Sequence, residues 1–169
     1  MSSVRAGIAL GSNLGDRLKM LQEARDQILT TDGVHAPVLQ SGIYEMSPVN
    51  CEPEAGDFYN AVIEVGFKNS PDALLADLRR IEVALGRERE HQRNVSRTID
   101  LDLLYFDDLQ LDEAHLQLPH PRIADRAFVL RPLADIAPDL RLPGQKATVR
   151  ELLVNLRSDE PTKRVTDKW

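Results

Sequence analysis

Two aspartates stand at a spacing that suggests metal chemistry. Asp100 and Asp102 lie two positions apart in the run RTIDLDLLYF. On a β-strand both carboxylates point to the same face, with their Cα atoms about 7 Å apart. Mg²⁺ prefers such oxygen ligands and takes one or two carboxylates together with phosphate oxygens and water. The pair predicts a site for Mg²⁺, in which two ions could share the carboxylates. An acid at every second position is also typical of the solvent-facing side of an ordinary amphipathic strand.

Four arginines precede the aspartates in an otherwise acidic chain, within the stretch 87–97: Arg87, Arg89, Arg93 and Arg97. Guanidinium groups bind phosphate oxygens through paired hydrogen bonds. A solvated charged loop is the simpler interpretation of the arginines alone. Beside carboxylates suited to Mg²⁺, however, they indicate a nucleoside triphosphate as substrate. The chain has no GxxxxGK[ST] motif or kinase glycine-rich loop, so arginines and metal must hold the phosphates.

Composition narrows the class of protein. A chain of 169 residues is about the size of one domain with its own core. Its 27 acidic and 21 basic side chains give a net charge of −6, which disfavours non-specific nucleic-acid binding. The single cysteine, Cys51, excludes an internal disulfide framework and fits a reducing compartment. No apolar run is long enough for a membrane span or a secretory signal. We therefore expect a cytoplasmic protein with neither a membrane nor a nucleic-acid partner.

The hydrophobic pattern predicts the order β-α-β-β-α-β over the first 106 residues. Apolar and β-branched runs indicate strands over 4–10, 38–44, 60–67 and 98–106. Helical spacing and capping residues indicate helices over 16–31 and 70–86. This order predicts an α+β fold, a ferredoxin-like antiparallel sheet with helices packed on it.

The remaining segments predict a functional loop and an extension. The connection MSPVNCEPEAGD between the second and third strands is long for a hairpin, which suggests a functional loop. After the fourth strand we expect a loop over 116–126 and helices over 127–136 and 149–156, a C-terminal helical and loop extension. The last dozen residues are polar and expected to fray, with Trp169 either docked or loose. The predicted domain is 1–158, followed by a tail, 159–169.

Around the aspartates the sequence resembles the 6-hydroxymethyl-7,8-dihydropterin pyrophosphokinase family. That signature runs basic-x-(Gly/Ala)-small-Arg-x-x-Asp-x-Asp, and this chain reads RNVSRTIDLD over residues 93–102. The resemblance extends over nearly the whole chain, from GSNLGDR near the start to PHPRIADRAFVLRPLADIAPD in the last third. Several spaced motifs in the same order are far more specific than the two aspartates alone.

The resemblance implies an ATP-dependent diphosphokinase, a transferase of the EC 2.7.6.3 type. It would move a diphosphate from ATP to 6-hydroxymethyl-7,8-dihydropterin, leaving AMP, in folate biosynthesis. ATP and the reduced pterin would be its small-molecule partners, and we expect a monomer.

The resemblance also implies a set of site residues. Asp100 and Asp102 would bind two Mg²⁺ ions and act in catalysis. Further catalytic residues would be Arg87 and Arg97. The ATP-binding set would be Arg89, Arg93, His120 and Arg126. The pterin-binding set would be Ser47, Val49, Phe58, Asn60 and Phe128, in which the Asn60 amide contacts the ring edge and Phe128 stacks on the ring. From the residues alone, His120 could be a turn histidine, Asn60 a loop end and Phe128 a core residue.

The chain departs from the family pattern at several positions. Val95 replaces the usual glycine or alanine, and Asn94 stands where many members have tryptophan. Pro121 follows His120 where some have tyrosine, and Met46-Ser47-Pro48 replaces Thr-x-Pro. We expect an active enzyme whose arginine-rich loop, 86–96, closes as a variant lid.

Three other classes of function remain open from the sequence. A non-enzymatic ferredoxin-like module could use the arginines only to bind an anion, which predicts nucleotide binding without AMP release. A DxD transferase acting on nucleotide-sugars would need a longer parallel α/β framework. An RNA-binding sheet is disfavoured by the acidic charge and by the lack of paired aromatic residues on the first and third strands.

Overall fold

A computed structural model describes residues 3–46, 57–86, 99–156 and 162–169. The first part contains β1 (Val4–Ser12), α1 (Arg17–Leu29), β2 (Val34–Gln40), β3 (Ile43–Met46), β4 (Phe58–Phe67), α2 (Pro71–Gly86) and β5 (Asp100–Phe106). The second part contains β6 (Leu111–Glu113), β7 (Leu116–Leu118), the 3₁₀ turn η2 (Ile123–Asp125), α3 (Ala127–Ile136), α4 (Val149–Asn155) and β8 (Thr162–Thr166).

One antiparallel sheet organises the molecule. Its strand order is β5-β1-β4-β3-β8, and β2 pairs with the other end of β4. The predicted second strand is divided into β2 and β3 at Ser41 and Gly42. There the Ser41 backbone N–H donates to the Val62 carbonyl, and the Ser41 hydroxyl accepts from the Val62 N–H. The β-α-β-β-α-β order is otherwise confirmed, and the fold is ferredoxin-like.

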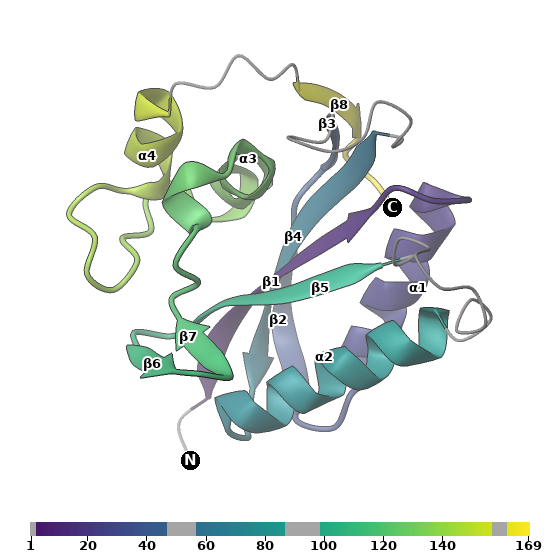
Figure 1. Cartoon of the computed structure of the whole chain (residues 1–169), viewed down its shortest axis with the longest axis horizontal. Coiled ribbons are helices and arrows are strands. Elements are labelled where there is room, and N and C mark those ends of the chain that lie inside the picture. The colour runs from purple at the N-terminus through teal and green to yellow at the C-terminus, as the bar shows by residue number, and fades with distance from the viewer. Residues whose placement is uncertain (1–2, 47–56, 87–98, 157–161) are drawn as a thin grey trace.

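Helices cover both faces of the sheet (Figure 1). α1 and α2 pack on one face over a core that includes Leu21, Leu78 and Leu101. α3 and α4 pack on the other face, where their core includes Leu104 and Leu130. The predicted C-terminal extension is therefore a second helical layer. It covers only part of its face of the sheet.

Local capping explains where two helices begin. The Asp16 side chain accepts from the Lys19 N–H at the start of α1. At α4, the Thr148 hydroxyl accepts from the Glu151 N–H while the Glu151 carboxylate accepts from the Thr148 N–H, forming a capping box. These hydrogen bonds lower the pKa of Glu151. Both helix starts agree with the sequence prediction to within a residue.

Two predictions about irregular segments are wrong. Residues 116–118, expected in a loop, form β7 and pair with β6. Residues 162–169, expected to fray, form β8 against β3 and a docked end. The Trp169 indole N–H donates to the Ser41 carbonyl at 2.8 Å, and the Arg25 guanidinium lies 5.1 Å from the ring centroid. The domain boundary at 158 stays a prediction.

Within the described ranges, none of the helices combines the length and apolar character that crossing a bilayer requires.

Replacing Trp169 by Ala should lower the free energy of unfolding by about 2 kcal/mol, because the indole packs against the first core and satisfies the Ser41 carbonyl. Urea unfolding followed by circular dichroism would measure the change. Lys168→Ala, which removes an exposed side chain, is the matched control. Equal stability of the two variants would contradict a structural role for the docked end.

Candidate active site

Strand β5 carries its two aspartates on the α3 face of the sheet. Ile99, Leu101 and Leu103 pack into the α1/α2 core. Asp100 and Asp102 alternate with them and therefore point to the opposite face. A register shift opposite Gly7 and Ile8 then brings both Leu104 and Tyr105 into the second core. The predicted common face of the two carboxylates is thus present, and an apolar cluster bounds it on one side.

A row of paired residues crosses the sheet beside Asp100. Asp100 pairs with Gly11, Gly11 with Asn60, and Asn60 with Tyr44, on β5, β1, β4 and β3 respectively. Strands in a sheet lie about 4.8 Å apart, so the Cα atoms of Asp100 and Asn60 are separated by about 10 Å. Figure 1 shows β5, β1 and β4 as neighbours. The register therefore places a carboxylate and an amide on either side of a glycine.

Gly11 lets the Asn60 amide lie close to β1. A Cβ atom at this position would lie 3.0 Å from the Asn60 Oδ1 atom and 3.8 Å from Cδ1 of Phe58. Asn60 is 7% exposed, and its amide has no hydrogen-bond partner among the residues that the structure describes. The two amide atoms are not among the fully buried side-chain atoms that lack a partner, so they remain accessible to a ligand. An accessible amide without a partner suits a ligand that has polar atoms at its edge.

His120 lies beside Asp102. Its backbone N–H donates to the Leu104 carbonyl at 2.7 Å, which holds the residue against β5. Its Nδ1 atom accepts from the Arg122 N–H at 3.2 Å, an arrangement that leaves the hydrogen of a neutral ring on Nε2. Burial lowers the pKa of His120, Arg126 and Arg122 lower it further, and the negative charge of Asp102 opposes them. A neutral imidazole at pH 7 is the result.

Arg126 and Phe128 stand at the start of α3. The Arg126 guanidinium lies 5.3 Å from the centroid of the Phe128 ring, an arrangement in which a cation and an aromatic face attract. Phe128 is partly buried against the second core. Phe58 on β4 is also half-buried. The influence of Arg126 on the pKa of His120 places this cation near the Asp102 side of the sheet. Arg126 and Asp102 are thus both near enough to His120 to influence its pKa.

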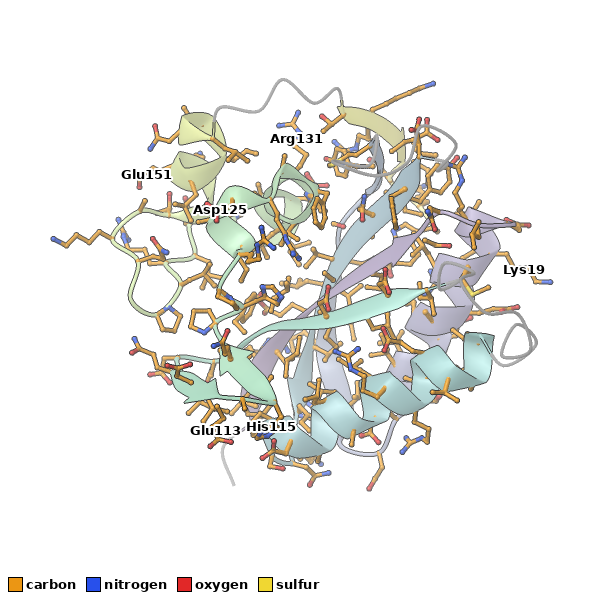
Figure 2. The ribbon with its side chains drawn as sticks, in the orientation of Figure 1. Lys19, Glu113, His115, Asp125, Arg131 and Glu151 are labelled. Atoms are coloured by element: carbon orange, nitrogen blue, oxygen red, sulfur yellow. The ribbon has the colours of Figure 1, made fainter. Side chains whose placement is uncertain are left out.

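Asp135 on α3 ties the helix to β3. Its carboxylate accepts from the Gly42 N–H at 3.1 Å and from the Tyr44 hydroxyl at 2.9 Å. The guanidinium groups of Arg131 and Arg164 lie 5.9 and 5.6 Å from the Tyr44 ring centroid; Figure 2 labels Arg131 on α3. Burial and then the hydrogen bond to Asp135 raise the pKa of Tyr44, which stays a protonated donor. Tyr44, the last residue of the row that begins at Asp100, is therefore fixed to α3 by Asp135.

Seven of the predicted site residues lie within the described ranges. On the α3 face lie Phe58, Asn60, Asp100, Asp102, His120, Arg126 and Phe128. The other predicted residues lie outside the described ranges: Ser47, Val49, Arg87, Arg89, Arg93 and Arg97. The roles assigned to both groups stay predictions.

Sequence reasoning gave no individual role to Gly11, Asn13 or Asp135. It used Gly11 only as part of the GSNLGDR motif, although a glycine after an apolar strand could have suggested the close approach of another group. Asn13, next in the same stretch, has a buried Oδ1 atom without a hydrogen-bond partner in the described part of the chain. Asp135 had no signal, because its partners Gly42 and Tyr44 are far away in the sequence.

The carboxylate pair fits a metal that takes its other ligands from a substrate. Within the described residues, no group of three or more His, Cys, Asp or Glu side chains could hold a metal ion by itself. Asp100 and Asp102 are half-buried and could supply the one or two carboxylates that Mg²⁺ uses together with phosphate oxygens. A site of this kind binds metal and polyphosphate together.

Two histidines should titrate on opposite sides of the ordinary value of 6.5. His120 should titrate below it, and Asp102→Asn should lower the pKa of His120 further by removing the opposing negative charge. His115 should titrate above it because it hydrogen-bonds to Asp72, and Asp72→Asn should bring it down. His115 lies on the β6–β7 hairpin beside Glu113 (Figure 2). NMR of the imidazole resonances would measure both, and a His120 pKa above that of His115 would contradict the geometry.

Known sequences place the chain in a family. Residues 7–138 match the family described as 7,8-dihydro-6-hydroxymethylpterin-pyrophosphokinase. The chain is 41% identical over 152 residues to the 2-amino-4-hydroxy-6-hydroxymethyldihydropteridine pyrophosphokinase of Methylorubrum extorquens, covering 90% of this chain and 93% of that one. The Bacillus subtilis protein of the same name is 42% identical over 131 residues, covering 78% and 77%. The one from Pseudomonas aeruginosa is 40% identical over 139 residues, covering 82% and 84%.

Solved structures support the fold. Wild-type Plasmodium falciparum HPPK-DHPS with pteroate matches with a TM-score of 0.68 at 16% identity, covering 90% of this chain and 44% of that one. The A437G variant with pteroate matches with a TM-score of 0.65 at 17% identity, covering 90% and 43%. The chain spans less than half the length of these proteins, and the likeness concerns the fold. By the family match and the identity to full-length relatives, the chain belongs to the 7,8-dihydro-6-hydroxymethylpterin-pyrophosphokinase family.

Proposed function

We propose that the chain transfers a diphosphate from ATP to the hydroxymethyl group of 6-hydroxymethyl-7,8-dihydropterin, releasing AMP, as a step of folate biosynthesis. Family membership supports this activity. The observation that carries it is the residue row of Asp100, Gly11 and Asn60, because it sets a carboxylate about 10 Å from an amide that has no partner within the described residues. That spacing suits a heterocycle recognised at the amide, with the reacting phosphates at the carboxylate.

The pterin would lie over Gly11. The Asn60 amide would donate to and accept from polar atoms at the ring edge, which would give this buried group the hydrogen bonds it otherwise lacks. Phe128 and Phe58, both half-buried on this face, would stack on the ring. Ser47 and Val49 complete the proposed pterin set. Rigid support comes from Tyr44, whose hydroxyl is fixed by Asp135.

The phosphates of ATP would lie on the Asp100 and Asp102 side. The two carboxylates would hold two Mg²⁺ ions, which when bound offset the charge of the phosphoryl oxygens. His120 and Arg126 would bind phosphate or ribose oxygens, and their place beside Asp102 supports this role. Arg87, Arg89, Arg93 and Arg97 complete the proposed phosphate-binding set.

Orientation would be the main contribution of the protein to the reaction. The pterin hydroxymethyl oxygen attacks the β-phosphorus, its bond to that phosphorus forms, and the bond from the β-phosphorus to the bridging oxygen breaks. The bridging oxygen leaves with AMP, and the hydroxyl proton is released. The sheet holds Asn60, the proposed pterin contact, and Asp100, on the proposed phosphate side, at a fixed separation. The bound pterin hydroxyl and the β-phosphate would therefore lose little further freedom before they react. The proposal assigns the proton to no particular side chain.

We further propose that the protein acts as a monomer in the cytoplasm. Its acidic charge and single cysteine fit that compartment.

AMP release from ATP should depend on the pterin, on Mg²⁺ and on both aspartates. Asp100→Ala and Asp102→Ala should each lower kcat at least about 100-fold, because each removes a metal ligand. Chromatographic detection of AMP would measure the rate. Asp108→Ala, an exposed carboxylate just beyond β5, is the matched control and should keep full activity. Tight ATP binding without pterin-dependent AMP release by the wild type would favour a binding module instead.

Gly11→Ala should raise the KM for the pterin about tenfold. The new Cβ atom would lie 3.0 Å from the Asn60 Oδ1 atom and would crowd the amide that is proposed to bind the pterin. Binding of α,β-methylene-ATP should stay unchanged, because Gly11 is proposed to contact only the pterin. Steady-state kinetics and calorimetry would separate the two. Loss of nucleotide affinity together with pterin affinity would point to a distorted sheet rather than a filled pterin site.

A further inference from the structure

The edge position of β5 poses a problem for the proposed metal site. Among the described residues β5 pairs with β1 on one side only, and it begins at Asp100 itself. In an antiparallel pair, alternate residues turn their N–H and C=O groups away from the partner strand. Leu101, between the two aspartates, is such a residue, and its side chain is completely buried. The strand end that carries the carboxylates therefore needs support from outside the sheet.

Helix α2 provides that support through two side chains. The Leu101 N–H donates to Glu82 Oε2 at 2.8 Å, and the Arg79 Nη1 group donates to the Leu101 carbonyl at 2.9 Å. The same Arg79 Nη1 group donates to Glu82 Oε1 at 2.6 Å. The three groups form a closed ring of hydrogen bonds. An arginine and a glutamate thus replace the missing neighbouring strand at one residue.

The two backbone groups of Leu101 that hydrogen-bond to α2 belong to different peptide units. The Leu101 N–H is part of the peptide unit that joins Asp100 to Leu101. The Leu101 carbonyl is part of the unit that joins Leu101 to Asp102. Fixing both units restricts the backbone rotation next to both aspartate Cα atoms, and hence the direction of both carboxylates. The ring therefore acts on the separation and orientation of the pair.

The energetics favour a rigid ring. Glu82 is 9% exposed, so its carboxylate requires compensation for lost hydration. Charge-assisted hydrogen bonds from Arg79 and from the Leu101 N–H supply it. The Arg79 side chain is 46% exposed and spans from solvent to the strand. Loss of either partner would leave Leu101 with an unsatisfied buried polar group.

We propose that Arg79 and Glu82 are positioning residues of the metal site, which set the geometry of Asp100 and Asp102 for metal and ATP without touching either. This inference rests on the proposed function of the two aspartates as Mg²⁺ ligands. Groups that orient metal ligands typically change metal affinity 10- to 100-fold when they are replaced. Glu82→Gln and Arg79→Ala should therefore each weaken metal binding about tenfold.

The test measures binding as well as activity. Electron paramagnetic resonance of Mn²⁺ in the presence of α,β-methylene-ATP would give the Mn²⁺ dissociation constant. Titration of the AMP-forming reaction with Mg²⁺ would give the half-saturating concentration. Both values should rise about tenfold in Glu82→Gln and Arg79→Ala, while the KM for the pterin stays unchanged. Arg79→Lys, which keeps a cationic donor, should recover most of the loss.

Asp77→Asn is the matched control. Asp77 forms an ion pair with Arg80 on the same helix at the same three-residue spacing, and its loss changes the net charge as Glu82→Gln does. It should leave the Mn²⁺ affinity unchanged.

If Glu82→Gln does not fold, Arg79→Ala carries the test, because the Arg79 side chain is half-exposed. Three results would overturn the inference. A lower melting temperature with unchanged Mn²⁺ affinity in both variants would show a role in stability alone. An equal loss of Mn²⁺ affinity in Asp77→Asn would show a general charge effect. Absence of Mn²⁺ binding by the wild type would refute the metal role of the aspartates, and this inference with it.

Discussion

The register of β1 between β4 and β5 is the constraint on which the site depends. β1 is paired along its length with β4 and over most of its length with β5, so its residues decide which side chains of the two neighbours stand opposite each other. A slip of one residue on either side would turn the polar set toward the α1/α2 core. The apolar row Ala6, Ile8 and Leu10 prevents this, because those side chains are buried in that core. Hydrophobic burial on one face thereby fixes polar geometry on the other.

One face of the sheet is buried in a core, and the other carries the candidate site. The α1/α2 face is closed and apolar along its length, with Ile8, Ile63 and Leu101 fully buried. The α3 face is apolar only where α3 and α4 cover it, around Val62 and Leu104. Beyond that cover the same strands present Asp100 and Asn60. The second layer of helices is thus also a wall of the candidate site, and Asp135 joins this wall to β3.

Much of this arrangement could be predicted because its signals are local. Alternation in the run around Asp100 indicated the common face of the carboxylates, and helical spacing indicated α1, α2 and α3. Contacts between distant segments carried no such signal. Glu82 reads as one charged residue of an amphipathic helix until Leu101 is placed against it. β8 was missed because an edge strand of polar residues resembles a polar tail, and only its pairing with β3 distinguishes the two.

Gly7 and Gly11 lie on the same face of β1 but serve different purposes. At Gly7 the space above the strand is filled by the Tyr105 ring, which a Cβ atom would approach to 2.3 Å. At Gly11 a Cβ atom would lie 3.0 Å from the Asn60 amide and 3.8 Å from the Phe58 ring, two groups of the proposed pterin-binding set. A lineage that lost its need for folate synthesis but kept the protein for another purpose would still be held to glycine at position 7. Position 11 would be free to drift, so the two glycines would record separate histories of selection on shape and on activity.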